Sequence, residues 1–144
     1  MADSEVQPAG IIPKIRTRIT KYRSARHFNE QNTKASLIVP VLDALGWDTN
    51  DPEDVLWEYK PRPRHNPVDF ALVLTRTPCM FLEAKALREK LVKDKVVTQI
   101  LSYASVAGVQ WVVLSNGDEY RIYNANAPVP VEEKLLRIAA AHCY

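Results

Sequence analysis

Two carboxylates and a lysine lie near the middle of the chain, within the run PVDFALVLTRTPCMFLEAK (residues 67–85). They are Asp69, Glu83 and Lys85. Carboxylate oxygens suit Mg²⁺, and a bound divalent ion lowers the pKa of a water and stabilises a phosphoryl transition state. A nearby lysine would reach that water or the developing oxyanion, a contact worth roughly several kcal/mol in a dry site. Taken alone, such a triplet is more often a structural ion pair between Glu83 and Lys85.

Two buried strands are expected to hold these residues. The apolar segment 68–74 contains Asp69, and a second apolar segment, 80–82, leads into Glu83 after a polar turn with a proline. Side chains alternate along a strand, so Glu83 and Lys85 point to the same face. Acids on buried strands are costly to leave unpaired. They therefore either bind something together or neutralise one another.

The composition indicates one globular domain with a substantial core, since the chain has 144 residues, of which 47% are hydrophobic and 25% charged. The first ten residues are polar and acidic, unlike a secretory signal, and no apolar run approaches the ~18 residues of a membrane span. Cys79 and Cys143 are far apart, which indicates free thiols in a reducing cytoplasm. The net charge of +2 does not identify a partner.

A basic amphipathic helix is expected over residues 11–28, after a loose arm (1–10). The segment has six basic residues, no acid, and isoleucines at helical spacing. A surface helix with solvated basic flanks is one interpretation, and contact with nucleic-acid phosphates is the other. A protein partner is less favoured, and a membrane surface least of all. The candidate DNA-backbone contacts here are Lys14, Arg18 and Lys21.

A second helix is expected from an Asn29 cap to Gly46, with a kink at Pro40. Glu30 lies in its first turn, where the helix dipole favours an acid. A strand over 55–59 comes next, because its residues are β-branched or aromatic.

The loop 60–67, KPRPRHNP, is rich in proline and basic residues. Proline cannot donate to a strand ladder, so a loop is expected here. Arg62 and Arg64 are candidate contacts to a DNA backbone, and a merely solvated loop is equally compatible with the sequence.

A helix over 94–107 carries Gln99 and Tyr103, which lie four residues apart and share one face. Strands over 111–114 and 119–123 flank an Asn-Gly turn, and a helix is expected over 131–142. These elements predict an α/β fold, a mixed central sheet of about five strands flanked by helices. The 94–107 helix would be a right-handed crossover.

With these residues in place, the chain resembles the PD-(D/E)XK nuclease superfamily, and within it the N-terminal nuclease domain of type I restriction enzyme R subunits. Five pieces carry the resemblance in the family's order: NEQNTKASLIVPVLDALGWD (29–48), PVDFAL (67–72), FLEAK (81–85), QILSY (99–103) and VVLSNGDEYRIY (112–123). It covers residues 29–123. We therefore divide the chain into an arm with the basic helix (1–28) and a restriction-endonuclease-like domain (29–144).

The resemblance implies a role for each site residue. Asp69 and Glu83 correspond to the metal-binding acids, Lys85 to the catalytic lysine, and Glu30 to an acid that assists the metal or water. Gln99 and Tyr103 match a QxxxY motif that positions DNA or metal-bound water, with Gln99 counted among the catalytic residues. The implied cofactor is Mg²⁺, or Mn²⁺ in its place.

Two departures from the family pattern bear on function. Val68 replaces the proline before the first acid, at a position that varies in the family. The chain has no GxxxxGK[ST] phosphate loop, so it is not a complete motor-bearing restriction subunit. A free-standing nuclease domain and a fragment of a larger protein, or a partner to one, both fit.

Two functional hypotheses follow. The first is a Mg²⁺-dependent DNA nuclease of the prokaryotic cytoplasm, acting in restriction or defence, with DNA as its partner and a homodimer compatible with the fold. The second is a catalytically inactive nuclease-fold module that binds DNA or a protein partner, in which the site is a retained ion-pair cluster.

Overall fold

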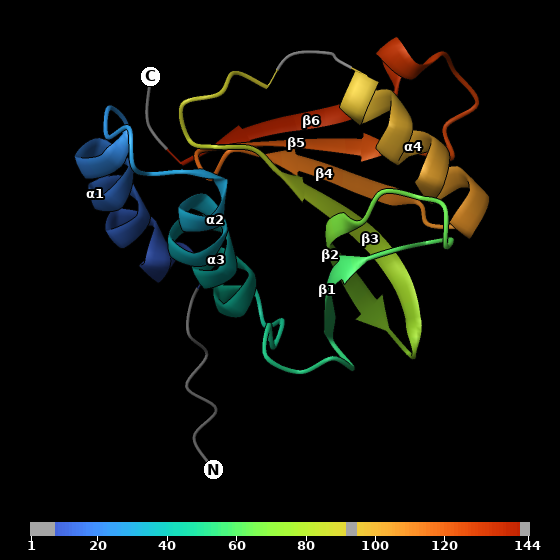
Figure 1. Ribbon diagram of the computed structural model, residues 1–144, viewed down its shortest axis with the longest axis horizontal. Helices are drawn as coiled ribbons and strands as arrows, with labels where there is room; N and C mark the ends of the chain where they lie inside the picture. Colours follow the sequence, from blue (N-terminus) through green and yellow to red (C-terminus); the bar gives the residue numbers. More distant parts are fainter. Residues whose placement is uncertain (1–7, 92–94, 142–144) are drawn as a thin grey trace.

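The computed structural model describes residues 8–91 and 95–141. The helical segments are η1 (Pro8–Ile11), α1 (Ile12–Tyr22), α2 (Glu30–Thr33), η2 (Lys34–Ile38), α3 (Val39–Ala44), α4 (Lys95–Ala107) and η3 (Val131–Glu133). The strands are β1 (Val55–Tyr59), β2 (Val68–Leu74), β3 (Thr77–Ala84), β4 (Trp111–Ser115), β5 (Glu119–Asn124) and β6 (Leu135–Ala140). Helices α1, α2 and α3 gather at one end of the molecule, apart from α4 (Figure 1).

The strands form one sheet in the order β1-β2-β3-β4-β5-β6. Neighbouring strands are antiparallel except β3 and β4, which run parallel. A parallel pair needs a crossover connection, and α4 lies in that connection. The predicted α/β class, with a mixed sheet flanked by helices, is therefore confirmed.

Each face of the sheet has its own apolar core, because successive residues of a strand point to opposite faces. On one face α4 packs on the strands through buried residues that include Ala71, Phe81, Ile100, Ala104 and Val112. On the other face η2 and α3 pack through Ile38, Leu42, Phe70, Leu72 and Leu82. Strands β2 and β3 thus contribute side chains to both cores, and the polar residue Asp69 of β2 is itself buried.

Helix α1 is attached to the rest of the domain by both apolar and charged contacts. Ile15 and Ile19 are buried in a third cluster that includes Phe28. Arg23 forms an ion pair of 2.5 Å with Asp118 in the turn between β4 and β5. The apolar face expected of the basic helix is therefore packed on the core.

The C-terminal segment corrects one expectation, because the helix predicted over 131–142 is not formed in residues 131–141, the part of it that the structure describes. Its start is only the short 3-10 turn η3, and β6 then pairs with β5, from Glu119 opposite Ala140 to Tyr123 opposite Leu135. Leucine, arginine and alanine favour a helix by intrinsic propensity. The open edge of β5 offers backbone hydrogen bonds that outweigh this preference. The sheet consequently has six strands instead of five.

Smaller differences concern the helices. Helix α1 ends at Tyr22 instead of residue 28, and the helix expected from Asn29 is divided into α2, η2 and α3, with the π-helical turn η2 just before Pro40. Residues 8–10 belong to η1 instead of a loose arm. Residues 1–7, Asp94 and Cys143 lie outside the described part. None of the helices in the described residues is long and apolar enough to cross a membrane.

Candidate active site

Asp69 and Glu83 lie beside one another on neighbouring strands. Phe70 pairs with Leu82 across β2 and β3. Because these strands are antiparallel, Asp69, the residue before Phe70, lies opposite Glu83, the residue after Leu82. The Asp69 backbone N–H donates to Glu83 Oε2 (3.2 Å), and the Ala84 N–H donates to Asp69 Oδ2 (2.7 Å). Backbone groups of the hairpin therefore hold both carboxylates in place.

The Glu83 carboxyl is the strongly perturbed group of the pair. Burial and the neighbouring charge of Asp69 raise its pKa from 4.5 to about 8, with a smaller contribution from the charge of Glu30. Glu83 therefore holds its proton more tightly than an exposed glutamate does. A carboxyl pushed this far by burial and a specific charged neighbour is characteristic of functional sites.

Lys34 is a cation of this site that the sequence argument missed. Its ammonium forms an ion pair with Asp69 Oδ1 and lies 3.5 Å from Glu30 Oε1 and 3.4 Å from Glu58 Oε1. Burial opposes its charge, but the Asp69 hydrogen bond and the charges of the three acids outweigh burial, and the pKa of Lys34 is raised. The four-residue spacing from Glu30 to Lys34 was a local signal for part of this contact. Glu58 comes from another element, and nothing in the sequence pointed to it.

Lys85 lies just past the end of β3 and is half-buried. Its backbone N–H donates to Ser115 O (2.8 Å), which fixes the point at which the chain leaves β3 beside β4. In the part of the chain that the structure describes, its ammonium has no carboxylate partner. The ion pair between Glu83 and Lys85 is therefore not formed among the described residues.

Gln99 and Tyr103 share the face of α4 that meets the basic loop 60–67. The Asn66 backbone N–H donates to the Tyr103 hydroxyl (3.3 Å), and its side-chain amide donates to Gln99 Oε1 (3.4 Å). The His65 ring stacks on Tyr103 with centroids 3.8 Å apart and planes at 11°. Both α4 residues thus contact the loop, and among the described residues no hydrogen bond joins them to the carboxylate pair.

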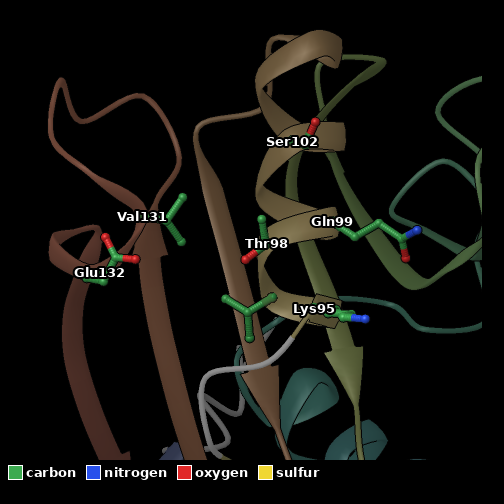
Figure 2. A pocket seen from close by; sticks show the side chains of 7 residues that line it. Lys95, Thr98, Gln99, Ser102, Val131 and Glu132 are labelled. Atoms are coloured by element: carbon green, nitrogen blue, oxygen red, sulfur yellow. The ribbon is translucent and has the colours of Figure 1, made fainter.

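A cavity of about 510 Å³ lies between α4 and η3. Figure 2 shows Val131 and Glu132 across from α4, with the Gln99 side chain pointing away from them. The described residues that line the cavity include neither Asp69 nor Glu83. This cavity is therefore separate from the carboxylate pair.

The comparisons with known proteins bear on the same region. A family model described as the type I restriction enzyme R protein N terminus matches residues 58–135, more than half of the chain. The chain belongs to this family. The match contains β2, β3 and α4, hence the carboxylate pair and Lys85, whereas Glu30 and Lys34 lie before it. No curated protein and no solved structure matches the chain.

The candidate DNA contacts of this R-protein domain fall in two places. The exposed ones are Arg62 and Arg64 in the loop, and Lys14 and Lys21 on α1. Arg18 differs, because its guanidinium donates to Ser36 O (2.7 Å) and is engaged within the domain.

Asp69 and Glu83 are the side chains of the R-protein domain that could hold a divalent ion. Asp69 and Glu83 offer hard oxygens, and Mg²⁺ is commonly held by one or two carboxylates with water completing its shell. No three His, Cys, Asp or Glu side chains converge as a preformed metal site within residues 8–91 and 95–141. An ion held here would therefore have two carboxylate ligands and take the rest of its shell from water, with no closed protein cage around it.

Proposed function

We propose that this domain is a nuclease that hydrolyses DNA phosphodiester bonds with Mg²⁺ or Mn²⁺ as cofactor, within a larger restriction protein or beside one. The observation that carries the proposal is the Asp69–Glu83 pair, joined across β2 and β3, with the half-buried Lys85 two residues further on. Membership of the type I R-protein family supports a restriction-related role.

Each site residue has a proposed role that follows from its chemistry. Asp69 and Glu83 would hold the ion, which when bound supplies a water of low pKa and neutralises charge on the phosphate. Glu30 adds negative charge near Glu83 and would support the ion from the helix side. Lys85 would place its ammonium at the developing oxyanion, where a single donor is worth about 10²–10³ in rate.

The loop 60–67 is the proposed DNA-positioning element. Arg62 and Arg64 are exposed on it, and its far end is held to α4 by the contacts of Gln99 and Tyr103 with Asn66. We therefore assign Gln99 and Tyr103 to positioning through the loop instead of to the chemical step. Exposed arginines that contact phosphates make binding weaken steeply with salt.

The test is cleavage of supercoiled plasmid and of linear duplex DNA, with Mg²⁺ or Mn²⁺ and with a chelator. We compare the wild type with Lys85→Ala. Arg137→Ala is the matched control, because it removes one exposed positive charge from β6, far along the sheet from β2. Lys85→Ala should lower the rate about 10²–10³-fold, and the control should cleave like the wild type. Equal rates for all three proteins, or no cleavage with any divalent ion, would reject the proposal.

A second candidate is a catalytically inactive module that binds DNA or a protein. The observation in its favour is Lys34, whose ion pair with Asp69 neutralises one of the two acids without a metal. This candidate predicts salt-sensitive binding that persists in Glu83→Ala and needs no divalent ion. Saturable Mn²⁺ binding that Asp69→Ala abolishes would exclude it.

A further inference from the structure

The Lys34 ammonium occupies the centre of an acidic cluster. The lysine is 3% exposed, and its nitrogen contacts carboxylates from three separate places: Glu30 in α2, Glu58 in β1 and Asp69 in β2. One positive charge therefore faces three acids. Glu58 is 56% and Glu30 44% exposed at the side chain, so both can move, whereas Asp69 is held by the Ala84 N–H.

The backbone around this ammonium is irregular on two sides. Lys34 begins the π-helical turn η2, and such turns are frequent at functional sites. Glu58 has φ of 50°, a left-handed conformation that costs a non-glycine residue of order 1–3 kcal/mol and clusters at ligand clamps. An exposed ion pair contributes only about 0–1 kcal/mol, which is too little to offset a backbone cost of this size. An ordinary surface ion pair would therefore not need either feature.

Resting on the proposed function, we propose that Lys34 is the resident cation of the Glu30–Glu58–Asp69 cluster. The Lys34 ammonium fills the position that a second divalent ion would take. This nuclease site therefore works with one ion, which is bound on the Glu83 side of Asp69. Removing the ammonium should then open a second cation site lined by the same three carboxylates.

The geometry makes this exchange reasonable. The Glu30 and Glu58 oxygens lie 3.5 and 3.4 Å from the nitrogen, and metal–oxygen bonds are about 2.1 Å for Mg²⁺. Two long, partly exposed side chains can close that difference without moving the backbone. With Lys34 gone, the three acids also repel one another, which favours capture of a divalent ion.

The experiment counts Mn²⁺ ions bound per chain by electron paramagnetic resonance, with the full chain and no DNA. It compares the wild type with Lys34→Met and Lys34→Gln. Lys34→Arg keeps the charge, and Lys90→Met removes an exposed lysine from the connection after β3, so these two serve as controls. The two neutral variants should bind one ion more than the wild type, and the controls should match it. Adding Glu58→Gln to Lys34→Met should weaken the extra site at least about tenfold.

The ion counts test the role of Lys34 and the nuclease proposal separately. One ion in the wild type and two in the variants supports both. One ion in every protein overturns the role of Lys34 and leaves the nuclease proposal standing. No ion in the wild type but one in the variants supports the role of Lys34 and contradicts the metal-dependent nuclease. Two ions in the wild type, or none in any protein, overturns the inference.

Stability gives an independent reading for variants that fold poorly. If Lys34→Met and Lys34→Gln are unfolded in chelator, Mn²⁺ should restore native circular dichroism, since a bound ion stabilises only the folded state. A failure of Mn²⁺ to restore folding would show that the ammonium has a purely structural role and would overturn the inference.

Discussion

Replacing Glu83 with glutamine should flatten the dependence of stability on pH. The folded-state pKa of about 8 lies above the ordinary value of 4.5. Between these values the folded protein keeps a proton that the unfolded chain has lost, so the free energy of unfolding falls as pH rises. The stabilisation of the protonated form is complete below about pH 4.5 and is lost by about pH 8.

The size of the loss follows from the same two values. Each pH unit in this window removes about 1.4 kcal/mol, so the rise from 4.5 to about 8 corresponds to roughly 5 kcal/mol. Relaxation of the half-buried side chain toward solvent reduces this figure, and we expect an observed loss of about 2–4 kcal/mol. That is a large share of the ~5–15 kcal/mol by which domains are stable.

The assay is urea unfolding at a series of pH values from 5 to 9 in the presence of a chelator. Glutamine mimics the protonated acid and can still accept the Asp69 N–H, so Glu83→Gln should lose far less stability than the wild type over this range. Glu53→Gln, at an exposed turn position, is the control and should follow the wild type. Parallel curves for wild type and Glu83→Gln would refute the reasoning. Saturating Mg²⁺ should also recover part of the wild-type loss above pH 8, because a nearby cation favours the carboxylate.

Two further predictions concern the scaffold. Gly117→Ala would place a Cβ 2.6 Å from Leu37 Cδ1 at φ of +86°, so it should cost about 2–4 kcal/mol in urea unfolding. Gly108→Ala has φ of +73° but open space, and should cost only about 1 kcal/mol; equal losses would show that Leu37 yields freely. Tyr103→Leu removes the ring stack and the hydroxyl contact that hold the loop 60–67, so hydrogen exchange there should accelerate while α4 stays protected. Unchanged exchange would mean that the loop is held elsewhere.

The nearness of Asp69 and Glu83 could be anticipated because both lie on strands of one hairpin. Apolar runs with a turn between them predict the strands, and the strand expected over residues 68–74 is the one observed. Antiparallel pairing then brings the two acids together through local connectivity alone. The helix with Gln99 and Tyr103 was also evident from its periodicity, but their contact with Asn66 was not.

The final strand could not be anticipated in the same way. The segment Leu135–Ala140 has helical propensity, and its state depends on the unpaired edge of β5. That edge exists only after the sheet has formed. A preference of a few tenths of a kcal/mol per residue is outweighed by pairing along a whole strand.

The sequence by itself determined the α/β class, the central hairpin and the two acids on it, because these depend on local periodicity and on residues joined by a short turn. The tertiary structure alone decided that Lys34 and Glu58 join those acids and that Lys85 has no carboxylate partner in the described part of the chain. The physical reason is that these contacts depend on how α2, β1 and β2 pack in space. Packing on that scale is set by the shared core, not by the spacing of any residues along the chain.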